Sequence, residues 1–149
     1  MDPAPYLDYV HEVSVDMVQP DPDLDRALHA LPGRKVVFTN ASARHAERVL
    51  GRLGVDHHMD GVFDIAAANY VPKPEPSVYR LLTETYAFDP ANAVMVEDVA
   101  RNLKPAAEMG MATVWVVTDR PWANAEAEDV EPDHTVTDLS GWLVEVSGA

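Results

Sequence analysis

Short apolar runs that alternate with helical patterns constrain the fold of this chain more than any other feature. The runs cover residues 35–39, 93–96 and 112–117, and each has the length and uniform character of a buried parallel strand. Apolar residues at helical spacing lie around them, over about residues 22–31, 42–53, 76–87 and 101–109. This alternation predicts a doubly wound, Rossmann-like α/β fold with a parallel sheet.

Residues that favour helix ends support these boundaries. Asp21 is a candidate N-cap for the first helix, and Ser42 can cap a second helix that Gly54 stops. Residues 62–66 form a candidate brief strand. Residues 119–134 are acidic and poorly periodic, as expected of an exposed connection.

The composition excludes several classes of function. The chain has 25 acidic and 11 basic residues, a formal net charge of −14, which repels nucleic-acid polymers and anionic membranes. It has no cysteine, so disulfides, thiolate metal sites and cysteine nucleophiles are excluded. We find no apolar run near the ~20 residues of a membrane span and no signal-peptide pattern. These features favour a cytoplasmic protein.

Polar residues follow the first apolar run directly. Thr39, Asn40 and Ser42 stand between that run and a helix, and ligands of open parallel sheets bind beyond the carboxyl ends of strands. A hydroxyl together with N–H groups at a helix start suits a phosphate. The alternative is that these side chains only cap the helix.

Two carboxylates, Glu97 and Asp98, follow the second apolar run. Adjacent carboxylates after a buried strand are costly without a cation or hydrogen-bond donors, and Mg²⁺ is often held by one or two carboxylates. Asn102 is placed to orient one of them or to cap the next helix. The alternative for Asp98 is a helix N-cap.

Two further polar features each leave two interpretations. Lys73 lies between Pro72 and Pro74, so its backbone is restricted and its charge is aimed either at a phosphate or simply into solvent. Residues 56–60 hold two histidines and two aspartates, which suits a metal site, although an exposed loop is the favoured interpretation there.

These motifs together resemble a known family. Phe38-Thr39-Asn40-Ala41, then Lys73-Pro74, then Glu97-Asp98 with Asn102 resemble motifs II, III and IV of the haloacid dehalogenase-like phosphohydrolase superfamily. The resemblance covers about residues 6–118. Finer features, such as Phe63-Asp64 and Met109-Gly110-Met111, look like its pyrimidine 5′-nucleotidase branch.

The resemblance implies a role for each matching residue. It implies a Mg²⁺-dependent phosphatase that acts on a nucleotide 5′-monophosphate or another small phosphate monoester through an aspartyl-phosphate. The implied roles are phosphoryl binding by Thr39 and Asn40, charge neutralisation by Lys73, Mg²⁺ binding by Asp98 with support from Glu97, and an outer position for Asn102.

The segment that would supply the nucleophile is not recognisable. The family's motif I is an apolar strand followed by Asp-x-Asp-x-Thr, and residues 1–20 instead resemble a remnant of the helical cap and hinge. Residues 21–149 would then be the α/β core, incomplete at its N-terminus without its first, central strand. One alternative places a strand at residues 12–18, with Asp16 as a substitute near the site.

This interpretation has consequences for activity and assembly. In the family, the motif I strand lies between the strands that here correspond to residues 35–39 and 93–96. Without it, those strands pair directly, another chain supplies a strand, or the domain folds poorly; exposed edges favour a homo-oligomer. We expect no appreciable turnover from these 149 residues. The alternative function is a non-catalytic α/β module that binds phosphate or a partner.

Overall fold

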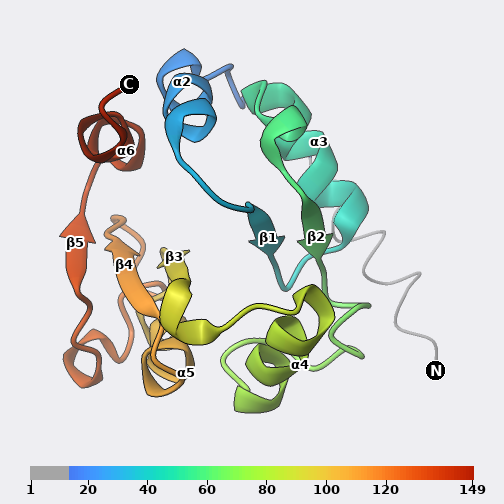
Figure 1. The fold of residues 1–149 in the computed structure, drawn as a ribbon, viewed down its shortest axis with the longest axis vertical. Coiled ribbons are helices and arrows are strands. Elements are labelled where there is room, and N and C mark those ends of the chain that lie inside the picture. Colours follow the sequence, from blue (N-terminus) through green and yellow to red (C-terminus); the bar gives the residue numbers. More distant parts are fainter. Residues whose placement is uncertain (1–13) are drawn as a thin grey trace. The chain divides into compact units, whose positions relative to one another are not determined.

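The computed structural model describes residues 14–149, which form two compact units (Figure 1). The first unit comprises the chain up to Tyr70 together with Ser140–Ala149, and the second comprises Val71–Leu139. All paired strands are parallel: β1 pairs with β2 in the first unit, and β3, β4 and β5 form a sheet in that order in the second. The expected α/β fold with parallel strands is confirmed.

The first unit contains α2 (Pro22–Ala30), β1 (Val36–Phe38), α3 (Ala43–Leu53), the short helix η1 (Asp56–His58), β2 (Gly61–Phe63) and most of α6 (Leu139–Ser147). The predicted helix ends are confirmed: Asp21 accepts the Leu24 N–H at 2.9 Å, and Ser42 caps α3. Gly54 ends α3 with φ of 77°, a left-handed conformation that glycine adopts without a steric penalty.

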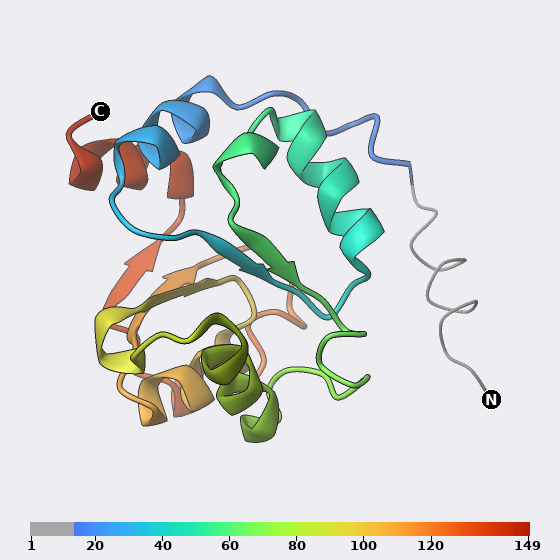
Figure 2. The ribbon, with the colours of Figure 1, turned by 45° about the vertical axis from the view of Figure 1, so that its right-hand side comes forward.

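Two kinds of contact hold the first unit together. The rings of Phe38 and Phe63 meet edge to face across the strand pair, with 5.6 Å between centroids. The Ser140 hydroxyl at the start of α6 donates a 2.6 Å hydrogen bond to the Asp21 carboxylate, and α6 lies beside α2 in both ribbon views (Figures 1 and 2). That bond, with the N–H of Leu24, lowers the pKa of Asp21 from its ordinary value of 3.8.

The second unit contains α4 (Pro76–Tyr86), η2 (Pro90–Asn92), β3 (Val94–Glu97), η3 (Ala100–Asn102), α5 (Leu103–Glu108), β4 (Ala112–Val116), η4 (Ala127–Asp129) and β5 (His134–Val136). Its core is formed by apolar residues of α4, α5 and β4, including Val78, Leu82, Leu103 and Val114. Pro105 stands in the first turn of α5, where its missing N–H costs no helical hydrogen bond.

A carboxylate fastens the edge of this second sheet. Asp133 accepts hydrogen bonds from both the backbone N–H and the hydroxyl of buried Thr113, at 2.7 and 3.0 Å. These donors lower the pKa of the Asp133 carboxyl. The strand that follows, β5, falls at the end of the stretch that the sequence indicated as an exposed connection, because three residues show too little periodicity to be recognised.

Over the described residues 14–18, the structure contradicts the alternative that placed a strand at residues 12–18. Residues 12 and 13 lie outside the described residues, and Asp16 lies in a turn closed by a 3.0 Å hydrogen bond from the Val18 N–H to the Val15 carbonyl. Met17, one of the alternating apolar residues, is 89% exposed, so this face of the segment is not covered as the apolar face of a strand would be. Asp16 is exposed in that turn, so it is not at the end of a strand.

The two strands expected to flank a missing central strand do not pair with each other. β1 is hydrogen-bonded to β2, and β3 to β4, so each is an edge strand among the residues that the structure describes. The predicted boundary between a cap remnant (1–20) and a core (21–149) stays a prediction, since most of residues 1–20 lie outside that range. Over residues 14–149 we find no helix long and apolar enough to cross a membrane.

Candidate functional site

A buried ion pair lies at the carboxyl end of β3. Lys73 Nζ is 2.6 Å from Glu97 Oε2, and both side chains are only 8% exposed. The other carboxylate oxygen of Glu97 accepts the Val99 N–H at 3.2 Å. The structure therefore rules out a solvated loop lysine at position 73: this cation is buried and paired at a strand end, where ligands of parallel sheets bind.

Asp98 follows Glu97 and has different surroundings. Its side chain is half-buried and makes no hydrogen bond or ion pair with any residue from 14 to 149. Its backbone carbonyl accepts the indole N–H of Trp115 at 3.1 Å, which fixes the main chain on β4. The short helix after it begins without a side-chain cap, so the N-cap alternative for Asp98 is wrong. A carboxylate held in place with unused oxygens suits a cation.

A hydrogen bond between Tyr79 and Asn102 holds the chain just after this strand end in place. Asn102 is 5% exposed, and its backbone carbonyl accepts a 2.6 Å hydrogen bond from the Tyr79 hydroxyl. Its side chain makes no hydrogen bond to Glu97 or Asp98, and it does not cap α5. Burial, and then the negative charge of Glu97, raises the pKa of Tyr79 above its ordinary value of 10.0. Tyr79 thus stays a neutral donor.

The polar residues after β1 belong to the first unit, and their oxygens serve the backbone there. Thr39 Oγ1 accepts the Ala41 N–H at 3.0 Å, and Ser42 Oγ accepts the His45 N–H at 3.4 Å. Asp64, the residue directly after β2, accepts the Ala43 N–H of α3 at 2.9 Å. The capping interpretation is therefore confirmed for Ser42. Thr39 keeps its hydroxyl proton to donate, and Asn40 is exposed.

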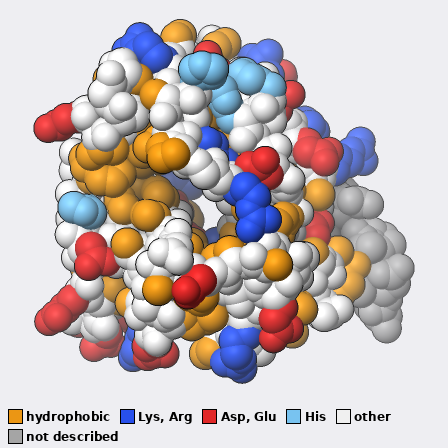
Figure 3. Space-filling view, in the orientation of Figure 1, with side chains coloured by type: hydrophobic (Ala, Val, Ile, Leu, Met, Phe, Trp, Pro, Cys, Tyr) orange, Lys and Arg blue, Asp and Glu red, His pale blue; other side chains and the backbone are white. Residues whose placement is uncertain are grey.

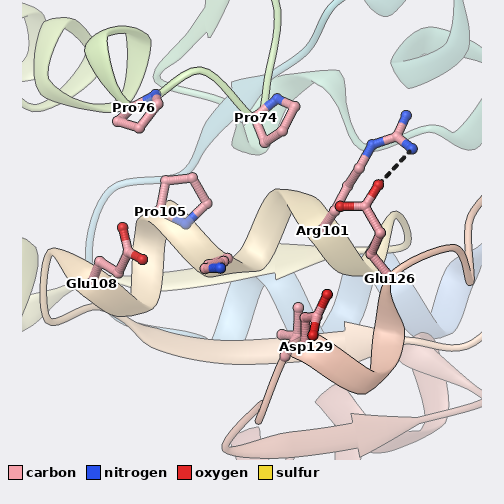
Figure 4. A pocket seen from close by; sticks show the side chains of 9 residues that line it. Pro74, Pro76, Arg101, Pro105, Glu108, Glu126 and Asp129 are labelled. Carbon is pink, nitrogen blue, oxygen red and sulfur yellow. Dashed lines mark ion pairs between the residues drawn. The ribbon is translucent and has the colours of Figure 1, made fainter.

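A surface pocket of about 280 Å³ lies elsewhere in the second unit (Figure 4). Three prolines, Pro74, Pro76 and Pro105, stand on one side of it, and charged side chains of both signs surround the rest. Arg101 and Glu126 form a partly exposed ion pair of 3.8 Å at its edge. Neither Lys73, Glu97 nor Asp98 lines it, so this pocket is separate from the charged strand end.

The structure thus brings four of the predicted residues, Lys73, Glu97, Asp98 and Asn102, into one unit and gives them unequal roles. Lys73 and Glu97 form a pair, and the Asp98 carboxylate makes no hydrogen bond or ion pair within residues 14–149. Sequence reasoning missed Tyr79, because an aromatic residue on an amphipathic helix carries no signal that its hydroxyl meets a distant carbonyl. It also missed the contacts of Asp64.

This α/β arrangement is found in solved structures. The L-2-haloacid dehalogenase from Xanthobacter autotrophicus with chloropropionic acid covalently bound superposes with a TM-score of 0.68 at 22% identity, over 87% of this chain and 62% of that one. A HAD phosphatase from Thermococcus onnurineus superposes with a TM-score of 0.62 at 21% identity, over 99% of this chain and 65% of that one. These similarities define the fold as that of haloacid dehalogenase-like proteins.

The sequence defines the family as well. The family model described as haloacid dehalogenase-like hydrolase matches residues 3–110, so the chain belongs to the haloacid dehalogenase-like hydrolase family. Enolase-phosphatase E1 of Frankia alni is 41% identical over 95 residues, which are 62% of this chain and 39% of that protein. Bifunctional epoxide hydrolase 2 of Sus scrofa is 40% identical over 58 residues, 39% of this chain and 10% of that protein. The chain spans well under half the length of either relative.

Proposed function

We propose that the chain carries the phosphate- and magnesium-binding part of a phosphatase that hydrolyses small phosphate monoesters. The observation that carries the proposal is the buried Lys73–Glu97 pair followed directly by Asp98, a carboxylate with no partner among the described residues. The enolase-phosphatases among its relatives support the reaction class. The resemblance to the pyrimidine 5′-nucleotidase branch makes a nucleotide 5′-monophosphate the first substrate to test.

The role of Lys73 follows from its burial. The Lys73 ammonium is held below the surface, where charges interact more strongly than in water, and the Glu97 carboxylate pairs with it and fixes its position. A phosphoryl group placed at this strand end would gain hydrogen bonds and charge neutralisation from Lys73. Glu97 acts through Lys73, as a positioning residue, because both of its oxygens already accept hydrogen bonds. For the first unit, the family resemblance alone supports a proposal that the hydroxyl of Thr39 binds phosphate.

Asp98 fits the requirements of a magnesium ligand. Mg²⁺ is usually bound through one or two carboxylates, with water and substrate phosphate completing its octahedral shell, and Asp98 supplies one such carboxylate. When bound, Mg²⁺ supplies positive charge that stabilises phosphate oxygens. Asn102 and the Tyr79 hydroxyl keep the chain beyond Asp98 in place, and the Trp115 indole N–H holds the Asp98 carbonyl.

We further propose that these 149 residues alone do not turn over a phosphate ester. The family reaction needs a pair of aspartates after a strand, whereas Asp16, the substitute that the sequence offered, is in an exposed turn, and Asp21, which forms an Asp-x-Asp with Asp23, caps α2. With neither in place, the chain binds phosphate and metal without transferring the phosphoryl group. This is also the non-catalytic alternative that the sequence left open.

Metal binding tests the proposal directly. Mn²⁺ can stand in for Mg²⁺ because its bound and free forms differ in electron paramagnetic resonance. We expect wild-type protein to bind Mn²⁺ in competition with Mg²⁺, Asp98→Asn to lose that binding, and Asp133→Asn, an acidic residue of the same unit, to retain it. Equal binding by wild type and Asp98→Asn contradicts the assignment.

Turnover provides the second test. p-Nitrophenyl phosphate and nucleotide 5′-monophosphates are incubated with Mg²⁺ and the protein, and inorganic phosphate release is measured. We expect no release above the protein-free rate. Release that disappears in Asp16→Asn would overturn the proposal, since it would make Asp16 the nucleophile.

An assembly follows from the edge strands. On β3, Val94 is 62% exposed and Val96 is 39% exposed, while no described strand pairs with the free edge of β3. Exposed apolar edges favour pairing between chains, so we propose that two copies associate through β3. Light scattering checks this: we expect the mass of an oligomer, lowered toward one chain by Val94→Lys. A mass of one chain at all concentrations contradicts it.

A further inference from the structure

Outside the charged strand end, a cluster of histidine and aspartate side chains gathers on the first unit. Asp25 of α2 and His57 and His58 of η1 place one ligand atom each within 4.8 Å of one another. Figure 3 shows histidine side chains gathered in this region, around α2 and the segment that precedes β2. We propose that Asp25, His57 and His58 form a binding site for Zn²⁺.

The distances between the ligand atoms already approach those of a zinc site. Asp25 Oδ1 is 2.7 Å from His58 Nε2 and 3.1 Å from His57 Nε2. Ligands bound tetrahedrally at about 2.0–2.2 Å lie about 3.3–3.5 Å apart. The two rings therefore have to move outward by less than about 1 Å relative to Asp25 for the ion to fit between these three atoms.

The site is partly preformed by the fold. Asp25 and His58 are separated by 33 residues, yet η1 is placed against α2 and the His58 side chain is only 10% exposed. His57 is 60% exposed, and its ring lies 4.0 Å from that of His58 between centroids. Buried His58 therefore provides a ligand whose position is fixed, and exposed His57 leaves the site accessible to an ion from solvent.

The donor set suits zinc better than the ions of the proposed phosphatase site. Two imidazole nitrogens and one carboxylate oxygen are typical of Zn²⁺, whereas Mg²⁺ prefers oxygen ligands only. Each ring binds through the Nε2 lone pair in its Nδ1–H form, so a neutral ring loses no proton. Either water or His29 takes the fourth position. His29 lies one helical turn after Asp25, and its ring centroid is 6.1 Å from that of His58.

Bound zinc would fasten α2 to η1 and so stabilise the first unit. A ligand that binds only the folded state raises the folded-to-unfolded ratio by about its concentration divided by Kd, so Zn²⁺ at a hundred times Kd raises that ratio about a hundredfold. The site requires no phosphatase activity, and its test is independent of the proposed function.

Isothermal titration of the tag-free full chain with ZnCl₂, in millimolar Mg²⁺, tests the site. We expect one equivalent of Zn²⁺ to bind wild type and to raise its thermal midpoint. Loss of even an outer partner of a metal ligand costs about 10–100-fold in affinity. We therefore expect Asp25→Asn and His58→Gln to lose at least that much. Co²⁺ should bind with the intense visible absorption of a tetrahedral ion.

Matched variants make the result specific. His134→Gln, an exposed histidine of the second unit, and Asp98→Asn should bind Zn²⁺ as wild type does. His57→Gln removes a largely exposed side chain, so it tests the site even where loss of buried His58 prevents folding. Wild-type affinity in Asp25→Asn and His57→Gln overturns the proposal and leaves Asp25 as a simple hydrogen-bond acceptor between two rings. So does an absence of zinc binding in wild type.

Discussion

After β1, in the first unit, polar side chains accept hydrogen bonds from backbone N–H groups, whereas at the end of β3, in the second unit, a lysine and a glutamate pair below the surface. Thr39 and Ser42 are half-buried, and their oxygens accept backbone N–H groups of the turn and of the start of α3. Lys73 and Glu97 have side chains only 8% exposed, so neither can turn to solvent. Polar residues that follow strands in the two units therefore differ in how much their removal lowers the free energy of unfolding.

This difference has a general physical basis. A capping oxygen satisfies a donor that the helix itself leaves unpaired, and its contribution to the free energy of unfolding is about 1 kcal/mol. A buried ion pair has lost most of its hydration, so removal of one partner strands the other charge. Charges kept at such a cost at a strand end point to chemistry there, which is why the functional proposal rests on the second unit.

The largest expected effect comes from breaking the buried pair. Lys73→Met leaves the Glu97 carboxylate without its cation, and such a change costs about 3–5 kcal/mol in the free energy of unfolding. Urea unfolding followed by tryptophan fluorescence measures it, with exposed Lys104→Met as the control. A double change to Lys73→Met and Glu97→Leu should recover much of the loss. A single-variant loss below about 1 kcal/mol would contradict burial of the pair.

The next largest effect on stability concerns the Tyr79 hydroxyl, which donates a hydrogen bond to the Asn102 carbonyl. Tyr79→Phe leaves the buried Asn102 carbonyl without its donor, which costs about 1–3 kcal/mol near neutral pH. Exposed Tyr70→Phe is the control. Equal unfolding midpoints for wild type and Tyr79→Phe would show that the hydrogen bond contributes nothing.

Tyr79 also predicts an alkaline pH dependence. Its pKa in the folded protein is raised above the ordinary 10.0, so the unfolded chain releases this proton first. The stability that Tyr79 contributes is complete below about pH 10 and is lost as the pH rises above that value. Urea titrations at alkaline pH should show a steeper decline for wild type than for Tyr79→Phe, and parallel declines would contradict the assignment.

A smaller effect is expected from the first unit. Asp21→Ala removes the N-cap of α2, at a cost of about 1 kcal/mol at pH 7. The folded pKa of Asp21 is below 3.8, so its stabilising contribution is present above that pH and declines as the pH falls below it. Ser140→Ala, which removes the main cause, should return the Asp21 pKa toward 3.8 in an NMR titration. No movement of that pKa would contradict the Asp21–Ser140 hydrogen bond.

The smallest effect is expected for an exposed ion pair, which differs from the Lys73–Glu97 pair chiefly in its exposure to solvent. Arg26 and Asp23 form an ion pair of 3.0 Å with side chains 55% and 63% exposed. Arg26→Ala should change the free energy of unfolding by less than about 0.5 kcal/mol, because water already solvates both charges. A loss as large as that of Lys73→Met would show that burial does not govern these ion pairs.

Much of the fold could be predicted because its signals are local. The helix caps at Asp21 and Ser42 and the stop at Gly54 depend on a few neighbouring residues, and the structure confirms all three. The alternative strand around Asp16 is not formed, because apolar alternation favours a strand but does not supply a pairing partner. β5 was missed because its three residues pair with a strand about 20 residues earlier.

For the candidate site, the sequence by itself determined which residue types follow each strand, and hence the family and the candidates Thr39, Lys73, Glu97 and Asp98. Only the tertiary structure decided that Lys73 is buried against Glu97, that the Asp98 carboxylate has no partner within residues 14–149, and that Asp25 meets two histidines 32 and 33 residues later. The physical reason is that burial and pairing depend on residues that are distant in the chain, whereas caps, turns and periodicity depend on neighbours.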